Sequence, residues 1–462
     1  MIRIPLTFFC LTAIAWPQQP DWPKAHRESL EHLTGLIRLE TSQPEGNEII
    51  AARYIKTILD AEGIPSEIFE SAPTRASIVA RLKGNGSKRP LLLLGHLDVV
   101  AVERENWSFD PFSGTVKDGK IFGRGSADDK GVVAGALQVL LELERQNVKL
   151  DRDVIFLGLA DEENGGDLGI TFLLREHRAA IDAEFAINEG GGGEIDPKSG
   201  EYREFQIGTA EKTPRRARLL ARGRAGHGSV PTKDNAVGVL ARAVARVFDN
   251  PLPPRLNETT RAYFERLAES SPPEQAAVFR AILEPNPSDE AQDKLRALNP
   301  RYYSMIRTSV VPTIFQGGYQ RNVIPSQAEA MLDIRALPDE DPEQLFSTLK
   351  RIIGEPTVDV VPLPVTRPAH RPAPIGGAVF RAFEKVLGKL YRGAVVLPTM
   401  GTGATDSAQL RAAGIPSYGF GPGRPAGEPS GAHGNDEAIY LAAYQDYIKI
   451  LWQVVNELAA AR

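Results

Sequence analysis

Two side chains that could do metal chemistry follow an apolar run in residues 91–100, LLLLGHLDVV. His96 and Asp98 are two positions apart, and alternate side chains of a strand point to the same face, so we expect both to emerge together. A carboxylate beside an imidazole fixes the tautomer of the ring and leaves its other nitrogen free to bind a metal ion. On its own, however, a His-x-Asp pair is more typical of an ordinary ion pair at a strand end.

Further acidic residues and a second histidine occur where other predicted strands or glycine-rich loops end. Open α/β sheets place their sites at the carboxyl ends of strands, and adjacent carboxylates repel one another unless cations or protons compensate. Taken singly, each segment is also explained as a surface turn, a helix N-cap or a solvated acidic turn. The residues are Asp128 and Asp129 in GRGSADDKG, Asp161, Glu162 and Glu163 after a strand at 153–160, Glu189 after a strand at 184–188, and His433 in SGAHGNDE.

These side chains are suitable ligands for divalent cations. The only cysteine is Cys10, in the N-terminal segment, so the available donors are imidazole and carboxylate. Such donors suit zinc most readily, and they also tolerate cobalt or manganese. Two ions about 3.5–4 Å apart need a bridging carboxylate and further ligands on each ion. The set provides these and leaves Glu162 over as a general base for a water molecule.

The elements that must position these residues have the order of an α/β protein. Apolar runs alternate with segments of helical spacing, which predicts βαβ units and a mainly parallel sheet. The predicted strands are 91–100, 153–160 and 184–188, and the predicted helices are 47–63 and those beginning at Lys130, Gly376 and Glu437.

After Glu211 the pattern predicts a smaller domain inserted in the larger one. Its order of strands and helices, β-α-β-β-α-β, is ferredoxin-like. A proline-rich, mostly helical stretch at about 251–300 interrupts it. This stretch could shape dimerisation or cover the cleft, and the sequence does not distinguish the two roles. We therefore predict a catalytic domain from 22–212 and 366–462, and an inserted lid or dimerisation domain at 213–365.

The composition of the 462 residues fits a two-domain globular protein, with 42% hydrophobic and 24% charged residues and a net charge of −5. Nothing indicates a basic surface for nucleic acid. Residues 1–15 combine Arg3, a short apolar run and the small residues Ala13 and Ala15, which is typical of a cleaved signal peptide. The alternative is a buried N-terminal segment. We expect a periplasmic or secreted protein with no later stretch of the roughly 18 apolar residues that span a bilayer.

Seven motifs in this order resemble the dinuclear zinc peptidase family of acetylornithine deacetylase, succinyl-diaminopimelate desuccinylase, aminoacylase and carboxypeptidases G and S. The resemblance extends over essentially the whole chain after residue 15, and the carboxypeptidase S and aminoacylase branch is most similar. It implies a zinc-exopeptidase-like catalytic domain with a ferredoxin-like lid. The motifs are GHLDVV, NWSFDPFSG, DGKIFGRGSADDKG, DEENGG, INEGGG, GHGSVP and AHGNDE.

The resemblance also implies a role for each candidate residue. Asp128 would bridge two metal ions through a turn with a cis peptide bond to Asp129, Glu162 would be the general base, and Asp98 would hold His96. The remaining ligands would be His96 and Glu189 on one ion, and Glu163 and His433 on the other.

In the inserted domain, the resemblance implies that His227 crosses a homodimer to stabilise the oxyanion in the partner's site. Asn322 and Arg335 match positions that grip substrate, and the loop 401–407, with Gly403, resembles one that binds substrate backbone. From the residues alone, His227 is more typical of a structural surface histidine, and the loop is typical of a helix N-terminus with small residues. Arg335 can bind a carboxylate through two points, or it can pair with Asp333 or Glu329.

The expected function is two-metal hydrolysis of an amide bond next to a free carboxylate, as in a dipeptidase or carboxypeptidase. One alternative keeps the chemistry and changes the substrate to an N-acyl amino acid. Another is a catalytically silent, peptide-binding dimer, which the retention of all five ligands and of Glu162 argues against. The partners that this predicts are a small peptide or N-acyl amino acid and a second copy of the chain.

Overall fold

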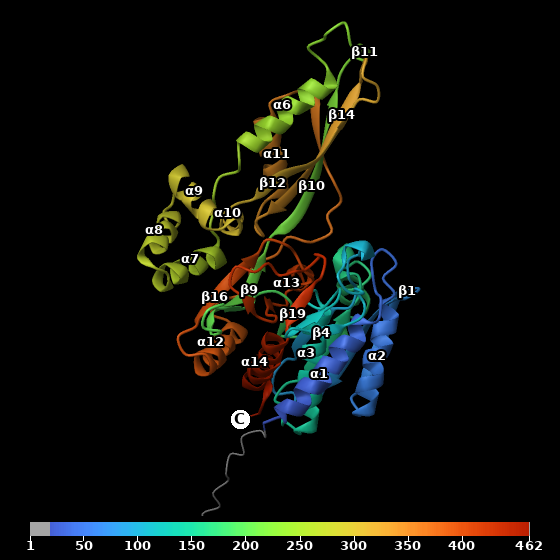
Figure 1. Ribbon diagram of the computed structural model, residues 1–462, viewed down its shortest axis with the longest axis vertical. Coiled ribbons are helices and arrows are strands. Elements are labelled where there is room, and N and C mark those ends of the chain that lie inside the picture. Colours follow the sequence, from blue (N-terminus) through green and yellow to red (C-terminus); the bar gives the residue numbers. More distant parts are fainter. Residues whose placement is uncertain (1–18, 462) are drawn as a thin grey trace, which may run out of the picture.

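A computed structural model describes residues 19–461, so the predicted signal peptide at 1–15 lies outside the described residues. Figure 1 shows a large domain, from which a smaller sheet domain extends along the long axis of the molecule. The last described residues lie beside the start of α1, Trp22–Ile37, at the end of the large domain that is remote from the smaller one.

The large domain is built on a ten-stranded sheet in the order β1-β2-β6-β3-β7-β17-β9-β8-β18, with β16 paired to β9. Its central strands β6, β3, β7 and β17 are parallel, and antiparallel pairs flank them. The predicted mainly parallel α/β fold is therefore confirmed. The strands are β1 Ser66–Ala72, β2 Arg75–Leu82, β3 Leu91–His96, β6 Val154–Leu159, β7 Phe185–Asn188, β8 Gly192–Ile195, β9 Tyr202–Glu211, β16 Val395–Gly401, β17 Ser417–Gly419 and β18 Arg424–Pro425.

Both faces of this sheet are covered by helices, which explains why the leucine side chains of β3 point to both faces of the sheet. Leu91 and Leu93 belong to one core cluster, and Leu92 and Leu94 to another. The first cluster includes α1 Trp22–Ile37, α2 Glu48–Ala61, α3 Lys130–Arg145, α12 Ala378–Leu390 and α14 Leu441–Ala459. The second includes α4 Ile170–Glu176, α5 Arg178–Ile181 and α13 Ser407–Ala412. Such a strand must end before polar side chains can reach water or a ligand.

The smaller sheet has the order β12-β14-β10-β15 with α6 and α11 packed on one face, which is the predicted ferredoxin-like arrangement. Asn235 and Asp341 cap the two helices with their side chains. A two-stranded ribbon, β11 with β13, extends from the far end (Figure 1). The bounds are β10 Thr213–Arg222, β11 Gly226–His227, α6 Ala236–Asp249, β12 Ser309–Gly317, β13 Val323–Ile324, β14 Gln327–Ala336, α11 Pro342–Ile353 and β15 Val358–Pro362.

The helices of the 251–300 stretch pack on the large domain. Their apolar side chains form one cluster with Ala210, Leu397 and Met400, at the edge of the large sheet. Figure 1 shows them to one side of the junction, next to β16 and level with the part of the smaller domain that is nearest the large one. They are α7 Glu258–Ser270, α8 Pro273–Ile282, α9 Asp289–Leu298 and α10 Pro300–Met305.

The C-terminal prediction needs one correction. The last helix begins at Leu441 and not near Glu437, because residues Ala438–Tyr440 form a short strand, β19. This strand pairs with β5, Lys120–Phe122, which in turn pairs with β4, Thr115–Lys117. The pairing brings the segment around His433 next to the loop that carries Asp128.

Candidate active site

His96 is the last residue of β3 and is almost completely buried. Its Nδ1 lies 2.9 Å from the backbone carbonyl oxygen of Asp98, which leaves Nε2 pointing away from the strand. The Asp98 carboxylate is farther away, with Oδ1 at 3.6 Å from Nδ1. The expected hydrogen bond from the ring to this carboxylate is thus replaced by one to the carbonyl oxygen, because Asp98 lies beyond the end of the strand.

The Asp98 carboxylate instead accepts hydrogen bonds from the backbone amides of Glu162, at 3.1 Å, and Glu163, at 3.0 Å. Gln43 Nε2 donates a third hydrogen bond to it at 2.8 Å. Asp98 therefore fixes the turn that follows β6. Through backbone hydrogen bonds it holds both Glu163, a candidate metal ligand, and Glu162, the candidate base.

Asp128 lies in the glycine-rich loop before α3, and its peptide bond to Asp129 is cis, as the resemblance implies. Glu437 Oε1 accepts hydrogen bonds from the backbone amides of Ala127 and Asp128, and Arg124 pairs with the same buried glutamate. Asp129 accepts a hydrogen bond from the backbone amide of His96. These contacts hold the loop against the end of β3.

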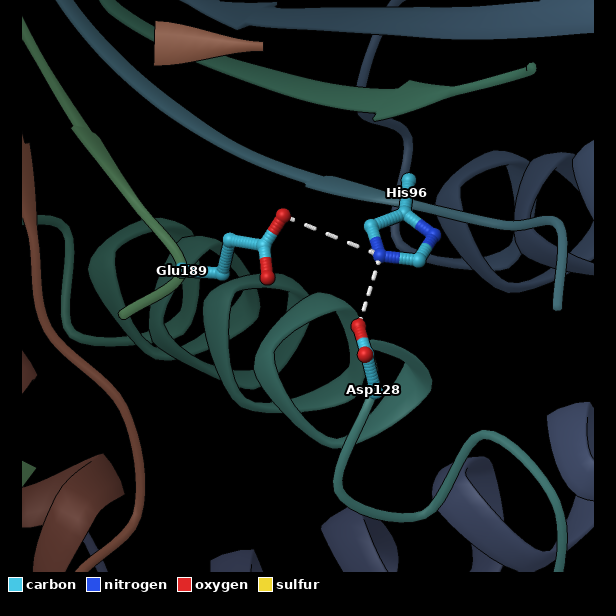
Figure 2. A group of neighbouring side chains, drawn as sticks. All are labelled: His96, Asp128 and Glu189. Atoms are coloured by element: carbon cyan, nitrogen blue, oxygen red, sulfur yellow. Dashed lines mark hydrogen bonds and ion pairs between the residues drawn. The ribbon is translucent and has the colours of Figure 1, made fainter. Parts of the chain in front are cut away.

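The carboxylate of Asp128 faces both histidines, one with each oxygen. Oδ1 lies 3.0 Å from His96 Nε2, and Oδ2 lies 3.2 Å from His433 Nε2. Glu189 Oε1, from the end of β7, is 3.7 Å from His96 Nε2, and Figure 2 shows these three side chains converging on one point. Glu163 Oε1 is 3.1 Å from His433 Nε2. All five residues named as ligands therefore lie together.

Charge and burial explain the protonation that this arrangement favours. Burial acts to raise the pKa of Asp128, but hydrogen bonds from His433 and His96 hold it below its usual range. The hydrogen bonds to Asp128 and Glu163 raise the pKa of His433 to about 10. For Glu189, burial and then the nearby charge of Asp129 raise the pKa. These pKa shifts are those of a group of side chains that favours positive charge among its members, which protons or a cation can supply.

The donors fit a pair of metal ions. His96, Asp128 and Glu189 can each place one ligand atom within 4.8 Å of the others, and so can Asp128, Glu163 and His433. Asp128 belongs to both groups, as a bridging ligand must. Two imidazoles and three carboxylates are the borderline and hard ligands that zinc, cobalt and manganese accept.

Glu162 lies beside this group but offers a different contact. Its Oε2 is 3.9 Å from His96 Nε2, while Oε1 pairs with the guanidinium of Arg367. Burial raises the pKa of Glu162, and the charge of Arg367 acts against that rise. A buried carboxylate with one free oxygen toward the ligand group is suited to moving a proton.

Among residues 19–461, none of the remaining predicted residues forms a hydrogen bond or ion pair with this group. His227 and Asn322 lie together on the exposed far ribbon of the smaller domain, where the backbone amide of Gly228 donates to the carbonyl of Asn322. Arg335, on β14, pairs with Asp333 at 3.1 Å, which was one of the two alternatives. Gly403 is exposed in the loop after β16.

The sequence reasoning missed Arg367, Glu437 and Asp436 as site residues. Arg367 lies in a proline-rich segment, TRPAHRPAP, and no spacing signals its contact with Glu162. Glu437 and Asp436 follow His433 within AHGNDE, where the histidine is the only residue with an evident role as a metal ligand. Their partners, Asp128 and Ser108, lie more than 300 positions earlier.

A family model described as Peptidase family M20/M25/M40 matches residues 92–457, which is most of the chain. The chain belongs to this peptidase family. The M20 assignment confirms the resemblance seen in the motifs, and it identifies the chain as an enzyme of the metallopeptidase and amidohydrolase kind.

Curated M20-related proteins are similar over much of the chain. A probable carboxypeptidase S-like 2 of Dictyostelium discoideum is 30% identical over 343 residues, covering 72% of this chain and 64% of that protein, which is less than two thirds of its length. The N-fatty-acyl-amino acid synthase/hydrolase PM20D1 of Homo sapiens is 28% identical, covering 92% of this chain and 87% of that protein. A probable succinyl-diaminopimelate desuccinylase of Staphylococcus aureus is 28% identical, covering 92% and 96%.

Solved structures share the fold. An M20 family metallo-carboxypeptidase from Sulfolobus solfataricus has a TM-score of 0.68 at 21% identity, covering 93% of this chain and 98% of that one. A dinuclear metal-binding peptidase of the M20 family from Bacillus subtilis has a TM-score of 0.61 at 14% identity, covering 94% and 98%. Among residues 19–461, none of the helices is long and apolar enough to cross a membrane.

Proposed function

We propose that this M20-family enzyme hydrolyses an amide bond next to a free carboxylate, acting as a dipeptidase or carboxypeptidase with two divalent ions, most readily zinc. The observation that carries the proposal is the position of Asp128 between His96 and His433, with the free oxygen of Glu162 at the edge of the same group. When bound, the ions would polarise the scissile carbonyl and make a water molecule more acidic.

Each residue then has a defined task. Asp128 would bridge the ions, His96 and Glu189 would complete one site, and Glu163 and His433 would complete the other. Glu162 Oε2 accepts the proton of the attacking water while the new C–O bond forms. As the C–N bond breaks, Glu162 returns that proton to the leaving amine, so the products are a carboxylic acid and an amine.

The substrate carboxylate needs a cationic or amide partner, for which Arg335, Asn322 and the Gly403 loop remain our candidates. Arg335 is partly exposed, and a substrate would have to compete with Asp333 for its guanidinium. His227 of the partner subunit is our candidate for stabilising the oxyanion, since His227 lies at the far end of the smaller domain of its own chain.

The proposal therefore includes a homodimer formed through the smaller domain. The edge strand β12 supports it, because its backbone is paired on one side only. Val311, Ile314 and Phe315 on this strand are 51%, 49% and 45% exposed. An apolar free edge of this length invites pairing with another strand. Lid closure about the connections near Lys212 and Pro364 would bring Arg335 toward the ions.

A second candidate function keeps the mechanism and changes the substrate to an N-acyl amino acid. The observation that favours it is the 92% coverage of this chain by the human relative named N-fatty-acyl-amino acid synthase/hydrolase. A panel of dipeptides and N-acyl amino acids, each assayed with zinc and with a chelator, tests both. Hydrolysis that depends on metal supports the proposal and identifies the class, whereas its absence from the whole panel favours a silent binding protein.

We also propose a periplasmic or secreted location, which rests on the signal-like residues 1–15. N-terminal sequencing of protein from the extracellular or periplasmic fraction tests it. A mature N-terminus after Ala15 supports the proposal, and an intact Met1 in the cytosolic fraction contradicts it.

A further inference from the structure

Arg367 is a buried cation whose guanidinium contacts the base candidate. Its Nη2 donates to Glu162 Oε1 at 2.5 Å and to the backbone carbonyl of Glu162 at 2.7 Å. Its Nη1 donates to Asp406 Oδ1 at 2.7 Å and to Gln409 Oε1 at 3.0 Å. The side chain is only 4% exposed, so these bonds form with little competition from water.

The two contacts to Glu162 distinguish its carboxylate oxygens. Oε1 is held by Arg367, whereas Oε2 is the oxygen 3.9 Å from His96 Nε2. Because the same nitrogen also holds the backbone carbonyl, rotation of the Glu162 side chain is restricted relative to its own backbone. Arg367 therefore determines which oxygen faces the metal-ligand group.

The backbone of Arg367 connects to the smaller domain. Arg215 Nη1, from the first strand of that domain, donates to the carbonyl oxygen of Arg367 at 2.9 Å. The amide of Leu363 donates to the carbonyl of Arg216, so the returning segment runs alongside β10 before it reaches Arg367. Arg367 therefore contacts the smaller domain through its backbone and Glu162 through its side chain.

We propose that Arg367 is a positioning residue for the M20 reaction, which fixes the Glu162 carboxylate so that Oε2 receives the proton of the attacking water. This inference rests on the proposed function. The competing explanation is purely structural: Arg367 neutralises the buried carboxylate of Asp406, and its contact with Glu162 has no consequence for turnover.

A double-mutant cycle between Arg367→Ala and Glu162→Gln separates these explanations. We expect R367A to lower kcat by about 10–100-fold, in the range of a catalytic group displaced by roughly 1 Å, with KM changed less than threefold and two metal ions retained. In the E162Q background the same change should cost less than threefold, because the group that Arg367 positions is already lost. Guanidinium ion added to R367A should recover part of kcat.

Arg367→Lys keeps the experiment informative if R367A does not fold. Lysine retains the charge beside Asp406 but cannot hold the carboxylate and the carbonyl of Glu162 together in the same geometry. We expect R367K to melt close to the wild-type temperature and still lose at least fivefold in kcat.

Equal losses from the Arg367 change in both backgrounds, an unchanged kcat, or a loss explained entirely by missing metal would overturn the inference. If E162Q itself retained turnover, the proposed role of Glu162 would fail first. The two failures are therefore distinguishable, since the single E162Q variant tests the function and the cycle tests Arg367.

Discussion

Asp436 and Ser108 are joined by two hydrogen bonds although 328 positions separate them in the chain. The amide of Ser108 donates to Asp436 Oδ1, and its hydroxyl donates to Oδ2, both at 2.7 Å. Asp436 lies three residues after His433, the most exposed of the five ligand candidates at 55%. The pair therefore anchors a loop whose ligand has little packing of its own.

From this we predict that Asp436→Ala lowers the affinity for one metal ion by about 10–100-fold, the usual effect of losing a residue that orients a ligand. The ion that His96 and Glu189 would hold should be retained. Metal content after dialysis against graded chelator measures this, and Ser108→Ala, which removes only one of the two bonds, should have a smaller effect. Equal loss of both ions would contradict the role given to the loop.

Glu162→Gln should lower kcat by about 10²–10⁴-fold while both metal ions remain bound, because the amide cannot accept the proton of the water. The measurement is steady-state turnover together with metal content. Asp167→Asn is a matched control, since Asp167 is exposed a few residues along the same segment and should keep normal turnover. Near-normal turnover of the Glu162 variant at full metal occupancy would rule out this base.

Arg75→Met should destabilise the protein by about 3–5 kcal/mol. Arg75 pairs with Glu48 at 2.7 Å and Asp161 at 2.9 Å, and all three are buried, so removing the guanidinium leaves two unpaired carboxylates. Since Asp161 begins the turn that carries Glu162, turnover should fall as well. Urea unfolding followed by circular dichroism measures the loss, and a change below about 1 kcal/mol would show that the group is not a net stabiliser.

Lys212 gives a pH dependence of stability. Burial, followed by the charges of Arg307 and Arg335, lowers its pKa from 10.5 to about 7, and Nζ donates hydrogen bonds to the hydroxyls of Ser304 and Ser309. Between pH 7 and about 10 the unfolded chain binds more protons at this residue than the folded chain. Stability should therefore rise with pH in that window through this residue, by on the order of 1 kcal/mol per unit.

Lys212→Met should abolish that contribution. The unfolding free energy of the wild type minus that of the variant should therefore rise from pH 7 to pH 9. Urea midpoints at three pH values measure it, and Lys350→Met, at an exposed position, is the control. Parallel pH profiles for wild type and the Lys212 variant would show that Lys212 stays charged in the fold.

Val311→Lys combined with Ile314→Lys should convert a dimer into monomers, because two charges on the free edge of β12 oppose pairing with a second copy. Light scattering after size-exclusion chromatography measures the mass. Val116→Lys, at a similarly exposed apolar residue of the large domain, should leave the dimer intact. A wild-type protein that is monomeric at micromolar concentration would contradict the proposed interface.

Several strands that position the site could be predicted from the sequence. The leucines before His96, the apolar run before Glu162 and the run before Glu189 are each short, flanked by helical segments and rich in buried side chains, so their strands could be predicted. The carboxyl ends of parallel strands meet at one edge, which is why three of the ligand candidates could be placed together. Residues 327–337, QAEAMLDIRAL, similarly allowed a strand of the smaller sheet to be predicted, and the alternating burial of β14 agrees with that prediction.

The contacts that position these side chains could not be predicted in the same way. The turn of Asp98 onto the amides of Glu162 and Glu163 depends on where β3 stops, and the start of the final helix depends on the pairing of β19 with β5. In each case the interaction joins segments far apart in the chain and has no local period.

By itself, the sequence determined the α/β class, the inserted ferredoxin-like domain and the types of side chain available to hold metal ions, because periodicity and donor chemistry are local properties. Only the tertiary structure decided that Arg367 takes one oxygen of Glu162, that Asp436 anchors the His433 loop, and that the 251–300 helices pack on the large domain. These depend on which distant surfaces are complementary in shape and charge, and a linear pattern does not encode that complementarity in any single segment.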